Sequence, residues 1–120
     1  MIEKFDWKKK TAIYIGRFQP FHKGHKEIFL NALKKNFQIS ILVMDSFGIN
    51  KKNPFKFNYV KNEINKNLRE YKHKYIIIKI PVVSEVVYGR MVGYKIRNIK
   101  LSKKIEKISA TQIRKKILSK

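Results

Sequence analysis

The stretch Thr11–His25, TAIYIGRFQPFHKGH, decides the fold, because its hydrophobic pattern changes from that of a strand to that of a helix. Its first part, Thr11–Gly16, is a short apolar run rich in β-branched and aromatic residues, which predicts a strand that ends in glycine. Arg17–His22 contains a proline and predicts a loop. Over Lys23–Asn36 the apolar residues fall at helical spacing, which predicts a helix.

The chain continues with the same alternation. The sequence predicts a buried strand over Phe37–Met44, a loop over Asp45–Pro54, a helix over Phe55–Tyr71 and a strand over Tyr75–Ile80. Strands that alternate with helices of this length predict parallel pairing with helices on both faces of the sheet. We therefore expect an α/β fold with three layers, α/β/α, built on a small parallel sheet.

The last third of the chain is less regular. It predicts a short strand over Pro81–Tyr88, a strand near Ile96–Leu101 and a closing helix over Ser109–Lys120, for which Ser109 or Thr111 supplies the cap. No repeat, low-complexity segment or linker is visible. With 120 residues in all, we expect one domain over residues 1–120.

Composition excludes several classes of protein. The chain has no cysteine, which excludes disulfides and cysteine zinc sites and is compatible with a reducing cytosol. Its longest apolar runs have the length of strands, too short to cross a bilayer. The first ten residues carry charges without an apolar run behind them, so no signal peptide is expected. We expect a cytoplasmic protein that does not use a membrane.

The net charge is strongly positive, at +21 from 29 Lys and Arg residues against 8 Asp and Glu residues. Such a charge attracts polyanions, whether nucleic acid, an anionic membrane surface or a polyphosphate substrate. The cations are scattered along the sequence, and Lys, Ile and Asn are abundant throughout. We therefore favour a compositional origin of the charge over dedicated nucleic-acid binding, and nucleic acid is not expected as a partner.

The loop after the first strand has residues suited to a polyphosphate. Gly16 lets the main chain approach a ligand closely, and the helix that begins near Lys23 offers unpaired N–H groups and a positive dipole end. His22 and His25 are three residues apart, so both side chains can face one spot, where imidazole N–H donors hold charge on a phosphate oxygen. Gly24 keeps the space between them open.

Two other interpretations compete for these histidines. In the first, the histidines are ordinary surface residues in a first helical turn. In the second, they are ligands of a His-x-x-His metal site. The metal interpretation is weak, because no cysteine and no adjacent carboxylate supplies further ligands. We therefore predict no protein-held metal. The complete string after a strand and before a helix favours phosphate binding over both alternatives.

The string Gly16–His25, GRFQPFHKGH, resembles the signature of the nucleotidylyltransferases that carry an HxGH motif. Its wording is most similar to that of nicotinamide-nucleotide adenylyltransferases and related small enzymes. A second family motif, ISxTxxR, has a counterpart in Ile108–Arg114, ISATQIR, and a weaker likeness lies in Asn53–Phe55. The resemblance spans Ala12–Arg114 and implies a Rossmann-like fold.

The resemblance also implies roles for individual residues. His22 and His25 would act at the α-phosphate, and Ser109, Thr111 and Arg114 would receive the β- and γ-phosphates. Independently of the family, hydroxyls and free N–H groups at a helix start form an anion site, to which Arg114 adds a forked cation. The other nucleotide-binding candidates are Gly16, Arg17, Phe18, Lys23, Gly24 and Arg90.

Four residues have open roles. Arg90 lies in a turn where the family often binds substrate, and an ordinary surface turn fits its sequence equally well. Asp45, at the end of the second strand, is a candidate for contact with the acceptor. Lys51 and Lys52 can reach an acceptor phosphate, although a solvated loop is the simpler interpretation.

Together these features predict a nucleotidyltransferase. It would transfer a nucleoside monophosphate from an NTP to a small phosphorylated acceptor and release pyrophosphate by in-line attack, without a covalent intermediate, and Mg²⁺ would bridge phosphate oxygens. The motif wording favours ATP over CTP, and the family suggests a homodimer. Two alternatives stay open: a basic nucleic-acid-binding module and a catalytically silent nucleotide sensor on the same fold.

Overall fold

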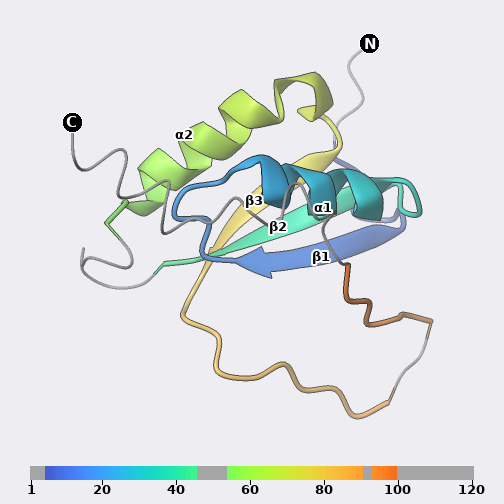
Figure 1. Cartoon of the computed structure of the whole chain (residues 1–120). Coiled ribbons are helices and arrows are strands. Elements are labelled where there is room, and N and C mark those ends of the chain that lie inside the picture. The colour runs from blue at the N-terminus through green and yellow to red at the C-terminus, as the bar shows by residue number, and fades with distance from the viewer. Residues whose placement is uncertain (1–4, 46–53, 91–92, 100–120) are drawn as a thin grey trace.

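The computed structural model describes residues 5–45, 54–90 and 93–99. Along the chain it contains β1 (Thr11–Gly16), α1 (Lys23–Leu33), β2 (Gln38–Met44), α2 (Phe57–Asn67), the short 3₁₀ helix η1 (Arg69–Tyr71) and β3 (Tyr75–Ile80), as Figure 1 shows. The predicted bounds of β1 and β3 are confirmed. No helix among these residues is long and apolar enough to cross a membrane.

The sheet has three parallel strands in the order β1-β2-β3. Thr11 lies opposite Gln38 in the first pair, and Ile39 lies opposite Tyr75 in the second. The α/β fold with a small parallel sheet, predicted from the sequence, is thus confirmed. Because all strands run the same way, the ends of β1, β2 and β3 meet at one edge, which we call the carboxyl edge.

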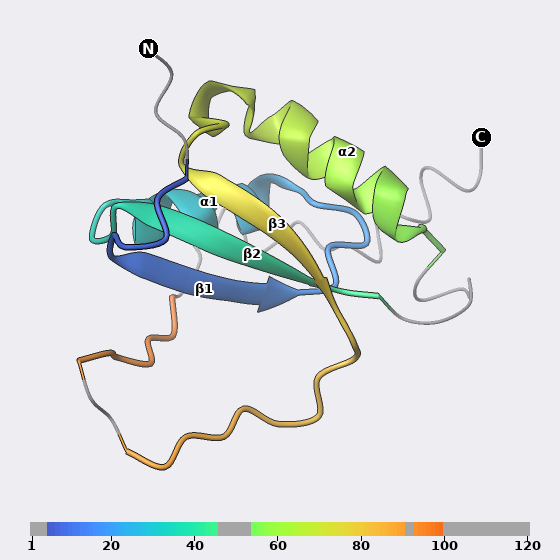
Figure 2. The same ribbon diagram turned by 180° about the vertical axis from the view of Figure 1, so that it is seen from behind.

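The core lies between the sheet and both helices. Ile39, Ile41 and Val43 alternate along β2 on one face and are almost completely buried. They form one cluster with Phe29 of α1 and with apolar residues of α2, so both helices cover the same face. Among the described residues the sheet and helices therefore form two layers, and the helices predicted on both faces of the sheet are not found there. Figure 1 shows α1 in front of the sheet, and Figure 2, from behind, shows the strands in front of α1. The closing helix predicted over Ser109–Lys120 falls outside the described residues.

Both helices are shorter than predicted, for reasons visible in their hydrogen bonds. At the end of α1 the Asn36 side chain donates to the Ala32 carbonyl oxygen at 2.8 Å, which competes with continuation of the helix. At the start of α2, the N–H and the carbonyl of Phe55 both bond to the side chain of Gln19, so the helix begins two residues later, at Phe57.

The predicted strand over Pro81–Tyr88 is wrong. The segment after β3 is extended and mostly exposed, but it pairs with no strand among the described residues. Figures 1 and 2 both show it leaving the carboxyl edge and running away from the sheet. It returns at residues 93–99, where Arg97 donates to the Asn31 side chain at 2.9 Å and Ile99 packs against the core. Residues 96–99 form no strand, and the rest of Ile96–Leu101 lies outside the described part.

Candidate functional site

The loop that joins β1 to α1 is folded around a buried aromatic ring. Phe18 has a positive φ of 51° and is only 2% exposed. Its ring lies so close to Gly16 that a Cβ at that position would be 2.7 Å from Phe18 Cζ. Glycine is therefore required at position 16 for packing against Phe18, a reason that differs from the close ligand approach predicted from the sequence.

Gln19 ties this loop to the segment before α2. Its side chain is 5% exposed, donates to the carbonyl oxygen of Phe55 at 3.0 Å and accepts from the Phe55 N–H at 2.9 Å. No role for Gln19 was predicted from the sequence. The sequence did contain one signal, a single amide side chain among the apolar residues Phe18, Pro20 and Phe21. All three of these neighbours are buried in the structure. The loop is thus fixed by two sets of contacts: the packing of Phe18 in the core, and the hydrogen bonds of Gln19 to Phe55 just before α2.

His22 and His25 form a reciprocal cap at the start of α1. The Gly24 N–H donates to Nδ1 of His22 at 3.0 Å, and the His22 N–H donates to Nδ1 of His25 at 3.1 Å. Their ring centroids are 3.9 Å apart. Because each Nδ1 accepts an N–H, the proton of each neutral ring resides on Nε2. The arrangement presents two Nε2–H donors at one helix N-terminus.

Both imidazoles are held in the neutral form at neutral pH. Burial and, to a smaller extent, the neighbouring His22 together lower the pKa of His25 from 6.5 to about 3. Burial also lowers the pKa of His22. The rings of Phe18 and Phe21 provide much of this burial, with centroids 5.0 Å and 5.4 Å from that of His25. Neutral imidazoles donate through Nε2–H without repelling each other as two cations would.

This geometry weakens both competing interpretations of the histidines. Surface residues without a role would be solvated, whereas these two are partly buried and bonded to the main chain. A metal would have to use the Nε2 atoms alone. No group of three His, Asp or Glu side chains among the described residues is arranged to hold a metal ion.

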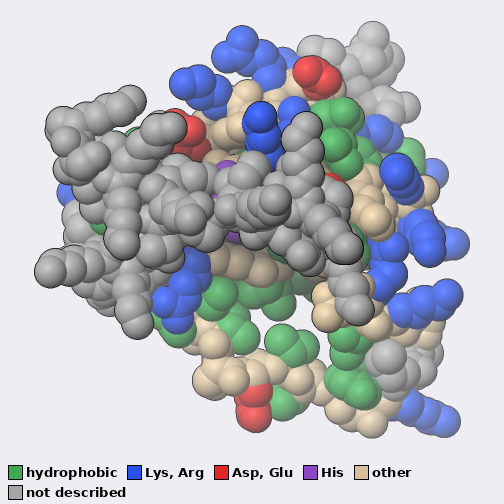
Figure 3. All heavy atoms as spheres, viewed as in Figure 1, with side chains coloured by type: hydrophobic (Ala, Val, Ile, Leu, Met, Phe, Trp, Pro, Cys, Tyr) green, Lys and Arg blue, Asp and Glu red, His purple; other side chains and the backbone are tan. Residues whose placement is uncertain are grey.

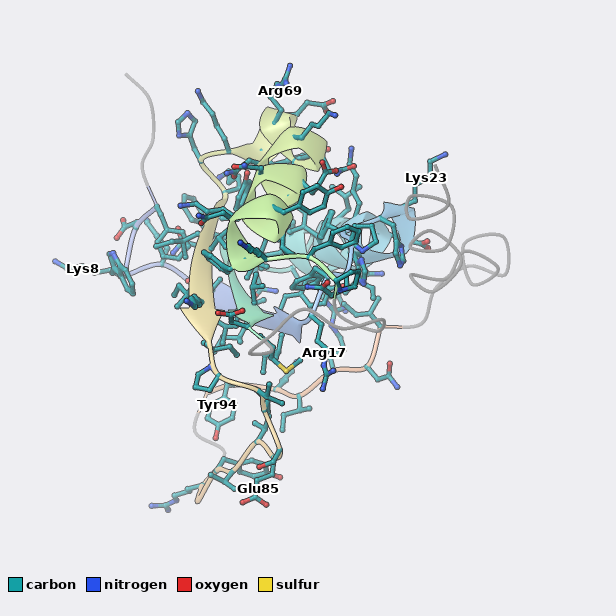
Figure 4. All side chains as sticks on the ribbon, turned by 90° about the vertical axis from the view of Figure 1, so that its left-hand side faces the viewer. Lys8, Arg17, Lys23, Arg69, Glu85 and Tyr94 are labelled. Carbon is teal, nitrogen blue, oxygen red and sulfur yellow. The ribbon has the colours of Figure 1, made fainter. Side chains whose placement is uncertain are left out.

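The other nucleotide-binding candidates in the described part are found on the loop, at the start of α1 and after β3. Arg17 and Lys23 are exposed at the two ends of the loop, and Figure 4 shows their side chains pointing away from each other. Gly24 is buried within the cap. Arg90 is exposed on the segment that follows β3 and leaves the sheet.

The acceptor candidate Asp45 lies at the carboxyl edge, directly after β2. Its carboxylate pairs with Lys79 at 3.1 Å, and its N–H donates to the Ile80 carbonyl oxygen at 2.9 Å. A ligand that binds Asp45 must therefore compete with Lys79 or bind both. The remaining candidates, Lys51, Lys52, Ser109, Thr111 and Arg114, lie outside the described residues, so their predicted roles remain predictions.

Comparison with known proteins gives three relevant similarities. Residues 13–57 match the cytidylyltransferase-like family. The nicotinamide-nucleotide adenylyltransferase of Thermoplasma acidophilum is 59% identical over 34 residues, which is 28% of this chain and 19% of that protein. A bifunctional NMN adenylyltransferase/ADP ribose pyrophosphatase from Francisella tularensis has a similar structure, with a TM-score of 0.57 and 32% identity over 62% of this chain.

The same Francisella protein matches with equal values in a second crystal structure. One of its two structures contains AMP and a manganese ion. This chain spans about a fifth of the length of the Thermoplasma protein and about a quarter of that of the Francisella protein. The matched family segment, residues 13–57, contains the whole loop, the histidine cap and Phe55, to which Gln19 is bonded.

Proposed function

We propose that this chain, whose residues 13–57 match the cytidylyltransferase-like family, is a nucleotidyltransferase: it transfers a nucleoside monophosphate from an NTP to a small phosphorylated acceptor and releases pyrophosphate. The names of the relatives favour ATP as the donor and nicotinamide mononucleotide as the first acceptor to test. The observation that carries the proposal is the histidine cap, which sets two neutral imidazoles side by side at a helix N-terminus.

The proposed reaction is a direct displacement. An acceptor phosphate oxygen attacks the α-phosphorus, a new P–O bond forms, and the bond to the bridging oxygen of pyrophosphate breaks. The acceptor is already anionic near neutral pH, so no general base is needed. The main barriers are repulsion between anions and correct positioning, which oriented donors lower. His22 and His25 would donate from Nε2–H to the α-phosphate oxygens as these gain charge.

The phosphates would be held by donors on both sides of the histidines. The main chain of Gly16–Phe18 and the side chains of Arg17 and Lys23 supply donors from the loop and the helix start. Because the Phe18 ring is buried, its contribution would come from the peptide group alone. Arg90 and the distant motif residues Ser109, Thr111 and Arg114 are proposed for the outer phosphates.

Magnesium is proposed as the metal partner of the triphosphate. The described residues offer one carboxylate at the carboxyl edge, that of Asp45, and it is paired with Lys79. Such a donor set fits a cation that is held mainly by phosphate oxygens and water, as Mg²⁺ commonly is. When bound, the ion would neutralise part of the phosphate charge. Asp45 is the residue proposed to contact the acceptor. A cytoplasmic location and a homodimer also stay predictions.

A pyrophosphate-release screen tests the proposal. Each of the four common NTPs is combined with nicotinamide mononucleotide, glycerol 3-phosphate or phosphopantetheine, with Mg²⁺ or with EDTA, while NTP binding is measured separately. We expect release that requires an NTP, an acceptor and the metal, and that is greatest for ATP with nicotinamide mononucleotide. NTP binding without release from any pair would identify a nucleotide sensor instead. Neither binding nor release would contradict the proposal.

A further inference from the structure

A basic surface lies at the edge of the sheet opposite the histidine cap. The segments that precede β1, β2 and β3 meet there and are joined by main-chain hydrogen bonds: Phe37 N–H to the Lys10 carbonyl at 3.1 Å and Ile39 N–H to the Lys74 carbonyl at 2.9 Å. The buried Gln38 side chain also bonds to the main chain of Asp6 and to the hydroxyl of Thr11. These bonds fix three separate segments into one surface.

Folding gathers cations on this surface that are scattered in the sequence. It carries eight Lys and Arg residues and two acids, Asp6 and Glu70; the cations are Lys8, Lys9, Lys10, Lys34, Lys35, Arg69, Lys72 and Lys74. We call this set the amino-edge surface. All of its cations except Lys74 are exposed. Figure 3 shows Lys and Arg side chains gathered along the right-hand side, where the strands begin in the view of Figure 1.

A structural role explains only part of this cluster. Lys34 and Lys35 follow the end of α1, where positive charge is favoured by the helix dipole. Lys8, Lys9 and Lys10 precede a strand, and no helix end explains them. Asp6, whose carboxylate accepts the Lys8 N–H at 2.9 Å, supplies one negative charge against three lysines and does not neutralise them. An excess of like charges held together by the fold is costly unless an anion binds there.

Aromatic rings lie among these cations. Trp7 is 76% exposed and rests edge-on against Phe5, with centroids 5.5 Å apart. The ring of Phe37, just before β2, is contacted by lysines from the segments before the other two strands. Lys74 Nζ lies 3.9 Å and Lys9 Nζ 5.5 Å from the ring centroid. Trp7 thus presents most of a flat ring to solvent, next to lysines. Lysines beside an exposed ring are the combination with which proteins bind unpaired bases and their phosphates.

We propose that the amino-edge surface binds single-stranded nucleic acid, with phosphates on the lysines and a base stacked on Trp7. Single strands fit better than duplexes, because stacking requires an unpaired base face. An anionic membrane fits less well, because Trp7 is the one large apolar side chain of this surface more than a third exposed among the described residues. The surface lies at the edge opposite the proposed transfer site, so this inference does not rest on the proposed function.

The experiment measures anisotropy of labelled oligo(dT) and oligo(rU) against salt, together with fluorescence of Trp7, the only tryptophan of the chain. A triple variant, Lys8→Gln with Lys9→Gln and Lys10→Gln, is compared with a matched triple, Lys56→Gln with Lys61→Gln and Lys95→Gln, which removes the same charge from exposed positions elsewhere. Pyrophosphate release is followed in parallel, and neither triple should change it.

We expect salt-dependent binding that quenches Trp7. The first triple should reduce the magnitude of the salt slope by about 2, since each lost phosphate contact removes about 0.7 in a single strand. Trp7→Ala should weaken binding about fivefold to a hundredfold, the range for one stacked base. Equal losses in both triples, or binding without Trp7 quenching, would overturn the proposal. So would binding to phosphatidylserine vesicles without binding to either oligonucleotide.

Discussion

Replacing Gln19 with leucine should destabilise the protein by unpairing the main chain of Phe55. Leucine has a similar size to glutamine but no polar group. It therefore removes the donor that Gln19 supplies to the Phe55 carbonyl at 3.0 Å and the acceptor that it supplies to the Phe55 N–H at 2.9 Å. Each group left without a partner costs about 1–3 kcal/mol when buried. Because Phe55 is only partly buried, water can replace part of the loss. We expect Gln19→Leu to lower the free energy of unfolding by about 2–4 kcal/mol.

The assay is urea unfolding followed by far-UV circular dichroism, with ATP affinity measured on the folded variant. Gln38→Leu is the matched control, because Gln38 is also buried and also bonds to a distant main-chain group, that of Asp6. Both variants should lose stability, but only Gln19→Leu should also weaken ATP binding, since it alone releases the loop beside the histidines. A loss of stability below about 0.5 kcal/mol, the usual range for surface substitutions, would refute the account of Gln19.

Three further predictions concern packing, pH and the distant motif. Gly16→Ala places a Cβ 2.7 Å from Phe18 Cζ and should cost about 1–3 kcal/mol in urea unfolding, whereas Gly89→Ala, with no atom within 4 Å, should be nearly neutral. Folding lowers the pKa of His25 from 6.5 to about 3, so the free energy of unfolding should fall as pH drops below 6.5, by about 2 kcal/mol at pH 5 from this residue. His25→Asn should therefore reduce the pH dependence, with His22 contributing the remainder, and an unchanged pH profile in that variant would count against this assignment. Arg114→Ala should weaken ATP binding about tenfold to a hundredfold by isothermal titration calorimetry, and an unchanged affinity would exclude Arg114 from the site.

The sequence predicted the local elements well where one pattern controls them. The apolar runs of β1 and β3 gave the observed bounds, because each run is a complete buried or half-buried strand. The ends of the helices were less predictable, since they depend on hydrogen bonds made by single side chains. Asn36 competes for the last turn of α1, and Gln19 occupies the main chain just before α2. Periodicity carries no information about such bonds.

In the site, too, contacts between residues close in sequence could be predicted, and contacts between distant residues could not. The facing of His22 and His25 followed from their spacing, because a capping contact joins residues three apart. The role of Gln19 did not, because its partner lies 36 residues away. Likewise, Gly16 was expected to admit a ligand, and its contact with the Phe18 ring depends on a positive φ that the sequence does not specify. The segment after β3 was misjudged because its apolar residues resemble a strand but find no partner strand among the described residues.

The central claim is that Nε2–H of His22 and His25 stabilises charge on the α-phosphate during transfer. Asparagine at either position keeps an acceptor near the place of Nδ1, so the cap can persist while the Nε2–H donor is lost. The most direct measurement is therefore kcat for pyrophosphate release from ATP and the acceptor found active, with ATP Kd, in folded His22→Asn and His25→Asn. We predict that kcat falls about 10²–10³-fold in each while ATP Kd changes little. A folded His25→Asn protein with a kcat near that of the wild type would contradict the claim.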